Sequence, residues 1–542
     1  MKIKNKKTVG LVGVIALVTI FFSFQSRFFE IAKQIEIYNN LFKTLNMNYI
    51  DEINPGELTN KAINNTLKNL DPYTVFYNEQ QMEDARIRRE GEYGGVGIST
   101  YYTKEGIVVA SVKEGYPADK IGLKAGDIIF AVNGDVIEGY EKNQLSNLLK
   151  GTPGTPLSIK VNRAGKKLDF DLKLDKIINN PVPFYEMINE DTGYIILTKF
   201  TSDKATAGVK KAFEELKEKG MKKLIFDLRS NPGGSLFDAV NITNLFIPKG
   251  KKVVDTRGKT KKNSRVYNTS KEPLDLEMPI VILINDRSAS ASEIVSGALQ
   301  DYDRAVVMGE RSFGKGLVQR YFELNYGTQM KATISKYYTP SGRCIQELDY
   351  ANRDAKTGKV PKFSDGVVNE FKTENGRKVL DGGGVLPDVV LGYSKKTDET
   401  KRLLKSRAIF NYVTDYVRKT PSIDLDNFSF KNFNEFKEYL KTTDTTFTSK
   451  QEKLFISAYK SDKENKYIAS AYKELKNKLQ EKKVAKISEN EDVLVPYIEN
   501  EIVERYYYKK GVYERNLKQD KGIKKALELV NNITKYNKLL KK

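Results

Sequence analysis

Serine and lysine are the residue types in this sequence that could carry nucleophilic chemistry. The 542-residue chain contains no histidine, which excludes a Ser-His-Asp or Cys-His hydrolase, an HExxH metalloprotease and any metal held by histidine. The base of an acid–base enzyme made from this chain must therefore be Lys, Asp, Glu or Tyr. The single cysteine, Cys344, excludes an internal disulfide framework and a multi-cysteine zinc site.

A serine-rich segment after an apolar run provides the first candidate. The run Pro279–Ile284 is typical of a buried strand, and small residues from Ser288 to Ser292 lead from it into a helix pattern. A serine at a helix N-terminus lies where the helix dipole stabilises developing negative charge, which suits a nucleophile. The alternative is an ordinary N-cap, with Ser290 or another serine as the cap and Glu293 completing a capping box. The local pattern leaves both interpretations open.

A lysine between two glycines provides the second candidate. The segment Gly309-Glu310-Arg311-Ser312-Phe313-Gly314-Lys315-Gly316 has the spacing of a nucleotide-binding P-loop, but glycine occupies position 316, where magnesium binding needs Ser or Thr. A strand-like alternation follows it instead of a helix. Burial lowers the pKa of a lysine, and a neutral amine can take the proton of a serine hydroxyl. In a chain without histidine, Lys315 is the simplest base for an activated serine.

Paired glycines after another apolar run could bind the negative charge that such a reaction develops. The run Lys223–Leu228 is followed closely by Asn231-Pro232-Gly233-Gly234. The exposed N–H groups of a loop of this kind can hold an anion or an oxyanion. A tight turn without any binding role explains the same residues.

These segments need a scaffold that brings the ends of strands together. Within residues 176–394, apolar runs alternate with helix patterns such as Leu236–Phe246 and Ala291–Leu299. Continuous apolar runs followed by a loop and a helix are typical of strands buried on both faces. This region therefore predicts an α/β domain.

The remaining regions differ in character. Residues 91–175 contain short apolar runs separated or ended by turn signals at Asn133-Gly134 and Ala164-Gly165, which predicts a small β-rich unit. Apolar residues keep a helical period in residues 28–90, and the basic region 395–542 also has a helical pattern. A chain of this length is expected to contain three or more such units.

Taken together, the candidate segments resemble the carboxyl-terminal processing peptidases, the tail-specific serine proteases of family S41 that use a Ser-Lys dyad. The resemblance rests on Ser288-Ala289-Ser290-Ala291-Ser292-Glu293, on Phe313-Gly314-Lys315-Gly316 with Gln319, on the Asn231–Gly234 loop, and on the segments Tyr338–Arg343 and Gly384–Asp388. It covers roughly residues 30–394. The long C-terminal extension resembles those of Bacteroidetes-type homologues, and we assign it no role from the sequence.

The resemblance implies a role for each residue of the site. Ser290 falls on the position of the nucleophile and Lys315 on that of the general base, with Gln319 supporting the lysine. The N–H groups of Gly233 and Ala291 fall on the positions of the oxyanion donors. No metal and no organic cofactor are implied.

The β-rich unit then resembles a PDZ domain, inserted between the helical N-terminal region and a crotonase- or ClpP-like α/β protease core. Its carboxylate-binding loop corresponds to Tyr93-Gly94-Gly95-Val96-Gly97-Ile98. In such domains, loop N–H groups capture a C-terminal carboxylate while an edge strand pairs with the extended tail. Arg163 lies where some family members carry a regulatory arginine that reaches the catalytic site. An ordinary surface charge is the alternative.

Residues 1–25 predict attachment to a membrane. Four lysines precede an uncharged run from Thr8 to Gln25, whose apolar part, Val9–Phe24, is 16 residues long. That is longer than most signal-peptide cores of about 7–15 residues and slightly short of a span of about 20. We expect a retained anchor, with a cleaved signal as the alternative. By the positive-inside rule, either places the rest of the chain outside the cytoplasm.

These features predict a serine endopeptidase of the cell envelope that recognises and cleaves proteins at or near their C-terminal tails. The net charge of +21 suits an anionic partner but selects none. The resemblance implies protein substrates with exposed apolar C-termini, contact with the inner membrane through the anchor, and no nucleic acid. It leaves open an activating adaptor and a homo-oligomer. The competing interpretation is a catalytically silent PDZ scaffold.

Overall fold

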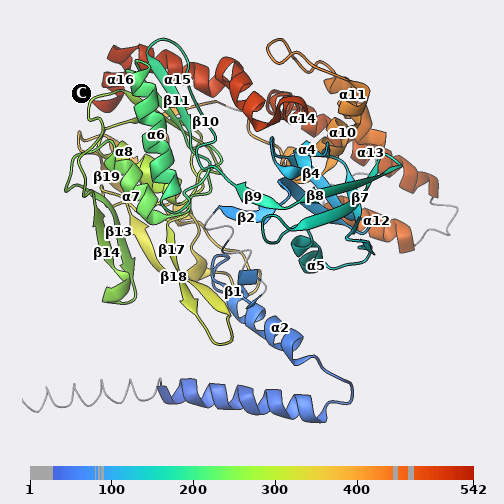
Figure 1. Cartoon of the computed structure of the whole chain (residues 1–542). Helices are drawn as coiled ribbons and strands as arrows, with labels where there is room; N and C mark the ends of the chain where they lie inside the picture. The colour runs from blue at the N-terminus through green and yellow to red at the C-terminus, as the bar shows by residue number, and fades with distance from the viewer. Residues whose placement is uncertain are drawn as a thin grey trace, which may run out of the picture. The chain divides into compact units, whose positions relative to one another are not determined.

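The computed structural model describes residues 28–542 apart from 80, 83–85, 87–90, 393, 443–447, 449 and 462–468 (Figure 1). The predicted anchor at residues 1–25 lies outside the described residues. None of the described helices is long and apolar enough to cross a membrane. The chain forms two compact units, one of residues up to 77 with 321–332, and one of residues 78–320 with 333–542.

The first unit consists of helices and a short β-ladder. Residues 28–48 are helical, and α2 (Pro55–Lys68) begins where the side chain of Asn54 accepts a hydrogen bond from the backbone N–H of Glu57 (3.1 Å). β1 (Val75–Tyr77) pairs antiparallel with residues 329–331. The predicted helices are confirmed for residues 28–48 and for α2, whereas residues 75–77 of the predicted helical region form strand β1 instead.

The predicted β-rich unit contains a small sheet, a separate two-stranded ladder of β2 with β9, and two helices. Its elements are β2 (Glu92–Gly95), β3 (Ile98–Thr103), β4 (Gly106–Val112), α4 (Pro117–Lys120), β5 (Ile128–Val132), β6 (Asp135–Val136), α5 (Lys142–Asn147), β7 (Pro156–Arg163), β8 (Lys166–Lys173) and β9 (Asp175–Ile178). The strand order is β3-β4-β5-β7-β8, so β3 lies at an edge. Alternate residues of β7, Leu157, Ile159 and Val161, are buried, as expected for a strand with one face on a core.

The α/β domain is built on a six-stranded sheet. Its elements are β10 (Phe184–Met187), β11 (Thr192–Ile196), α6 (Lys204–Glu218), β12 (Lys223–Asp227), α7 (Leu236–Asn244), β15 (Ile280–Ile284), α8 (Ala291–Asp301), β16 (Val306–Gly309) and β21 (Val389–Val390). The strand order is β10-β11-β12-β15-β16-β21. All neighbouring pairs are parallel except β10 with β11. The predicted α/β fold class is confirmed.

Helices cover both faces of this sheet. On one face, residues such as Phe226 and Ile282 pack with helices α6, α7 and α8. On the other face, Ile225 and Val281 pack with apolar residues of α15 (Lys521–Asn531) and α16 (Ile533–Leu540). The last two helices of the predicted extension therefore complete the core of the α/β domain, which the sequence interpretation had not assigned to them. The continuous apolar runs of β12 and β15 were the signal, because strands of that kind need cover on both faces.

The rest of the C-terminal region is a helical assembly with its own core (Figure 1). Its helices are α9 (Asp398–Lys405), α10 (Ala408–Lys419), α11 (Phe433–Thr442), α12 (Lys450–Ser461), α13 (Ala469–Ser488) and α14 (Glu491–Gln519). Helix α14 is broken at Tyr507 and Tyr508, where Tyr508 has a φ of 55° and a ψ of −169°. Within its core, Glu499 and Arg515 form a buried ion pair (2.7 Å).

The remaining elements fall between strands of the α/β sheet in the sequence, either between β12 and β15 or between β16 and β21. They are β13 (Lys252–Gly258), the 3-10 turn η1 (Lys261–Asn263), β14 (Arg265–Asn268), β17 (Leu317–Glu323), β18 (Gln329–Tyr338), η2 (Tyr350–Asn352), η3 (Phe363–Asp365), β19 (Glu370–Lys372) and β20 (Lys378–Leu380). β13, β14, β17 and β18 belong to a second sheet, and β17 confirms the strand that the alternation after Lys315 predicted.

Candidate active site

Ser290 lies at a strained junction between β15 and α8. Its φ of 56° and ψ of −112° place it in a region that residues other than glycine rarely adopt. Such strain persists only where the surrounding structure fixes it, and it is concentrated at functional sites. An ordinary N-cap residue has an extended backbone instead. The backbone of Ser290 therefore favours the nucleophile interpretation over simple capping.

The glycine loop after β12 is held directly against this junction. Because β12 and β15 are adjacent parallel strands, their carboxyl ends open onto the same edge of the sheet. The carbonyl oxygen of Asn231 accepts hydrogen bonds from Ala289 N (3.0 Å) and Ser292 Oγ (2.9 Å). A Cβ on Gly233 would lie 2.8 Å from Ala291 N, so only glycine fits there. The structure thus brings together the two segments predicted to hold the oxyanion.

The two predicted oxyanion donors are not equally free. Ala291 N–H is the first amide of α8, where helix geometry provides no partner. Gly233 N–H instead donates a hydrogen bond to Asn231 Oδ1 (2.9 Å), as in an Asx turn. An oxyanion at Ser290 must therefore share the Gly233 N–H with the Asn231 side chain or displace it. Sequence reasoning missed this competing bond, although an Asn two residues before the donor is its local signal.

A buried carboxylate joins the serine junction to the lysine loop. Glu293 Oε2 accepts hydrogen bonds from the backbone N–H groups of Ser290 (2.7 Å) and Lys315 (3.0 Å). Its Oε1 accepts from Gly314 N (2.7 Å) and Ser312 Oγ (2.5 Å). Burial raises the pKa of Glu293 to about 6, against the opposing effect of these hydrogen bonds. The predicted capping role of Glu293 is confirmed toward Ser290, but its link to the lysine loop was missed.

Lys315 occupies a loop that its glycine neighbours make possible. The side chain of Lys315 is half-buried. A Cβ on Gly314 would lie 2.6 Å from Glu347 Cβ, and one on Gly316 would lie 2.8 Å from Gln346 N. Gly316 is followed by strand β17 and not by a helix, so the segment is not a P-loop.

Gln319 lies on β17, two residues after the first residue of that strand. Its Nε2 donates a hydrogen bond to Thr333 Oγ1 on β18 (3.2 Å). The structure thus places Gln319 in the second sheet, on the strand that directly follows the lysine loop. Its predicted support of the Lys315 amine stays a prediction.

The predicted carboxylate loop of the PDZ domain is a turn that leads into edge strand β3. Gly94 and Gly95 end β2, which pairs with β9, and Val96 and Gly97 form the turn before Ile98, the first residue of β3. Gly97 has a φ of +85°, and a Cβ there would lie 2.4 Å from Tyr116 Cβ. The turn therefore packs closely against the segment that contains Tyr116, and only glycine allows this approach.

Arg163 is held inside the PDZ domain. It forms a bidentate pair with the buried carboxylate of Asp127, from Nε and Nη2 (2.7 Å each), and also donates to the carbonyl oxygen of Gly122 (2.8 Å). These partners explain why the pKa of Arg163 is raised, chiefly by the hydrogen bond to Asp127. The structure therefore ties Arg163 to its own domain, and a reach toward Ser290 stays a prediction.

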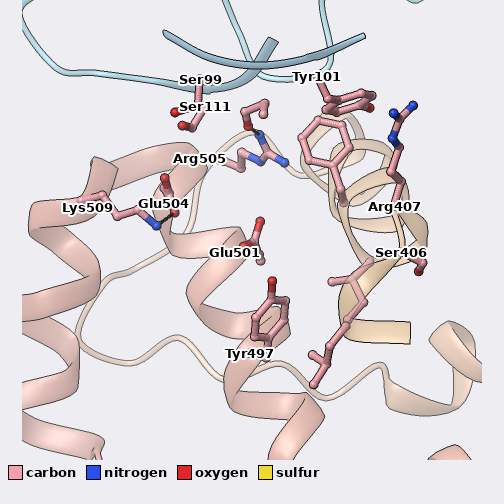
Figure 2. A pocket seen from close by; sticks show the side chains of 14 residues that line it. Ser99, Tyr101, Ser111, Ser406, Arg407, Tyr497, Glu501, Glu504, Arg505 and Lys509 are labelled. Carbon is pink, nitrogen blue, oxygen red and sulfur yellow. Dashed lines mark hydrogen bonds and ion pairs between the residues drawn. The ribbon is translucent and has the colours of Figure 1, made fainter. Parts of the chain in front are cut away.

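The PDZ sheet also packs on the C-terminal helices, around a cavity of about 380 Å³ (Figure 2). Arg505 of α14 donates a hydrogen bond to the carbonyl oxygen of Ala110 on β4 (2.9 Å). Tyr101 of β3 meets Phe410 of α10 edge-on, with ring centroids 5.4 Å apart, and Arg407 lies over the Tyr101 ring. The predicted catalytic residues do not line this cavity, which belongs to the contact between the PDZ domain and the helices.

Comparison with known proteins agrees with this architecture. Residues 191–352 match the model of peptidase family S41, residues 94–174 match a PDZ domain, and residues 399–530 match the C-terminal helical domain described as "Probable PDZ-protease". The chain is 35% identical over 320 residues to a carboxy-terminal-processing protease of Bartonella bacilliformis, covering 58% of this chain and 73% of that protein.

Two further relatives cover more of their own length. The chain is 30% identical over 460 residues to a "Probable CtpA-like serine protease" of Staphylococcus aureus, covering 84% of this chain and 82% of that protein. Among solved structures, a photosystem II D1 C-terminal processing protease is 28% identical, with a TM-score of 0.35, covering 57% of this chain and 89% of its own. On the sequence relatives alone, the chain belongs to the carboxy-terminal-processing proteases, serine-type peptidases of family S41 that carry a PDZ domain.

Proposed function

We propose that this peptidase hydrolyses proteins at or near their C-terminal tails through a dyad of Ser290 and Lys315. The observation that carries the proposal is the Glu293 carboxylate, which accepts hydrogen bonds from the backbone N–H groups of both residues. One buried side chain thereby fixes the nucleophile segment beside the base segment. Family membership supports the same pairing, because both dyad positions match the family pattern.

The reaction follows from the chemistry of these groups. The neutral amine of Lys315 takes the hydroxyl proton of Ser290 as Oγ forms a bond to the carbonyl carbon of the substrate. The carbonyl oxygen becomes an oxyanion, which Ala291 N–H and Gly233 N–H hold at the N-terminus of α8. Lys315 then gives the proton to the amine that leaves as the peptide bond breaks. Water attacks the acyl-enzyme by the same route in reverse and releases Ser290.

We propose the PDZ domain as the element that selects the tail. β3 lies at the edge of its sheet, so it can accept an extended C-terminal strand through main-chain hydrogen bonds. The tight turn at Val96 and Gly97 precedes that strand, where the terminal carboxylate binds in this recognition mode. Substrates with exposed apolar C-termini suit this mode of recognition.

The proposed location is the cell envelope. Lysines before the apolar run Val9–Phe24 support an anchor in the inner membrane with the catalytic part outside the cytoplasm. The N-terminus of the native protein tests this directly. A first residue after Phe24 would show a cleaved signal instead of a retained anchor.

One experiment tests the proposed reaction. The full chain and its Ser290→Ala variant are each incubated with an unstructured protein that ends in an apolar tail, and the fragments are identified by mass spectrometry. We expect fragments from the wild type alone. Identical fragments from both proteins would exclude the dyad, and no fragments from either would favour the silent scaffold.

A further inference from the structure

The N-terminus of α15 meets the glycine loop of the proposed site. Asp520 is the N-cap of α15, and its Oδ1 accepts a hydrogen bond from Ile523 N (2.8 Å). Both carboxylate oxygens of Asp520 also lie 2.9 Å from Nη1 of Arg229, which directly follows Leu228 in the loop after β12. The two side chains are largely buried, with 17% of Arg229 and 23% of Asp520 exposed. This pair joins residues that are 291 positions apart in sequence.

Arg229 is held on its other side as well. Its Nε and Nη2 donate to the buried carboxylate of Asp227 at the end of β12 (3.0 and 2.6 Å), which also accepts a hydrogen bond from Tyr194 Oη (2.8 Å). The guanidinium is therefore fixed between the sheet, through Asp227, and the C-terminal helices, through Asp520. Bidentate and charge-assisted contacts of this kind fix geometry more strictly than neutral hydrogen bonds.

The loop that starts at Arg229 leads directly to the oxyanion donor. Ser230 has a φ of +61°, and its N–H donates to Asn285 Oδ1 (2.8 Å) in the segment that precedes the nucleophile. Gly233 follows three residues later and lies against Ala291 N. The position of Gly233 N–H thus depends on where Arg229 starts the loop.

We propose that Asp520 is a positioning residue for the proteolytic step, acting through Arg229 to hold the oxyanion loop, residues 229–234, against Ser290. The inference rests on the proposed function and extends the catalytic machinery into the C-terminal helices. The same region contacts the PDZ domain, because Tyr508 of α14 donates a hydrogen bond to Asp119 (2.6 Å). Asp520 thus directly follows α14, the helix that contacts the PDZ domain through Tyr508.

The test separates the ion pair from the helix cap. Asn is as good an N-cap as Asp, so Asp520→Asn keeps the cap of α15 and removes the charge that faces Arg229. Asp426→Asn is the matched control, because Asp426 pairs with Lys518 at the exposed end of α14 and has no part in the loop. Full-length wild type, both variants and Ser290→Ala are compared on one peptide with an apolar C-terminus.

Two readouts distinguish positioning from a merely structural role. The first is the division of the effect between kcat and KM. The second is the affinity of a peptide aldehyde with the same sequence: Ser290 Oγ bonds to the aldehyde carbon, the hydroxyl proton passes to the lysine amine, and the aldehyde oxygen takes up the negative charge. Because this adduct places an oxyanion in the same loop, its Kd reports the oxyanion site itself.

Loss of a whole oxyanion donor lowers kcat about 100- to 1000-fold. A loop that is only loosened should cost less, so we expect kcat of Asp520→Asn to fall about 10-fold. The Kd of the aldehyde should rise by a similar factor, and KM should change little. Asp426→Asn should match the wild type in all three. Wild-type kcat and aldehyde Kd in Asp520→Asn would overturn the inference, as would a kcat loss that disappears once the folded fraction is measured by thermal unfolding. If Ser290→Ala is inactive, either of these results for Asp520→Asn overturns the role of Asp520 alone. If Ser290→Ala is active, the dyad itself is overturned.

Discussion

The carboxylate of Glu293 offers the sharpest single perturbation of the proposed site. Replacement by glutamine keeps the shape of the side chain but turns one acceptor oxygen into an NH₂ donor. In either orientation of the amide, at least one of the backbone N–H groups that Glu293 binds loses its acceptor. A buried donor without a partner costs about 1–3 kcal/mol.

Removal of the buried charge offsets that cost. Burial raises the pKa of Glu293 to about 6 from its ordinary 4.5, a difference of about 1.5 that corresponds to about 2 kcal/mol at neutral pH. The free energy of unfolding of Glu293→Gln should therefore lie within about 2 kcal/mol of the wild type. Activity has no such compensation. When the backbone N–H of Ser290 or Lys315 loses its acceptor, the nucleophile can move relative to the base, and a misplacement of about 1 Å can lower the rate about 100-fold.

The assay pairs urea denaturation with kcat/KM on a peptide substrate. Glu499→Gln is the matched control, because Glu499 is a buried carboxylate that pairs with Arg515 in the core of the C-terminal helices. That control should lose more stability, about 3 kcal/mol, since it leaves a buried guanidinium unpaired, yet keep its activity per folded molecule. Wild-type kcat/KM in Glu293→Gln would refute the reasoning.

The same group predicts opposite trends of stability and activity in acid. Because the folded-state pKa of Glu293 is raised, the wild type gains stability relative to Glu293→Gln as pH falls from about 6 toward 4.5. Activity should fall over that range, because protonation removes the charge that strengthens the hydrogen bonds from the backbone N–H groups of Ser290 and Lys315. A plot of log kcat/KM against pH should steepen below pH of about 6 in the wild type and not in the variant. Equal slopes would count against the role of Glu293.

Other predictions concern the PDZ turn and the last two helices. Gly97→Val should weaken binding of an apolar C-terminal peptide, measured by fluorescence anisotropy, and spare cleavage of a short peptide without such a tail; equal losses would mean that the PDZ domain gates the active site. Deletion of residues 521–542 uncovers one face of the core sheet, so the shortened chain should lose cooperative thermal unfolding, and a sharp transition would show that these helices are dispensable. Tyr536→Phe should cost about 1 kcal/mol of unfolding free energy in urea, because the hydroxyl bonds both backbone groups of Ile280; no loss would mean that water replaces it.

The local elements of the site were predictable because their signals are local. The apolar runs before Asn231 and Ser290 form adjacent strands β12 and β15 of one sheet, as buried parallel strands should. The turn signals at Asn133-Gly134 and Ala164-Gly165 appear as pairs of residues with positive φ, which match the twist of a hairpin. Residue type and spacing were sufficient for these elements.

The contacts that join distant segments were not predictable in the same way. Glu293 matches the pattern of a capping box, and that pattern holds no information about a loop about 20 residues later. The Arg229–Asp520 pair links segments 291 residues apart, and a charged residue on a basic helical tail usually faces solvent. Gly233 N–H turns toward Asn231 because a short polar side chain competes locally for backbone donors. The Glu293 and Asp520 contacts depend on tertiary packing, whereas the Gly233 bond is local and was missed although Asn231 is its signal.

The measurement that tests the dyad most directly is kcat/KM against pH for the wild type, Lys315→Arg and Lys315→Ala. A lysine with the ordinary pKa near 10.4 is almost wholly protonated at neutral pH, so catalysis requires a lowered pKa, and wild-type kcat/KM should rise with pH through it. A guanidinium does not lose its proton in this range, so Lys315→Arg should be nearly inactive despite keeping its charge. Lys315→Ala should fall about as far as Ser290→Ala, because nucleophile and base act as one unit. Substantial activity in Lys315→Arg, with the wild-type pH profile, would contradict a lysine base.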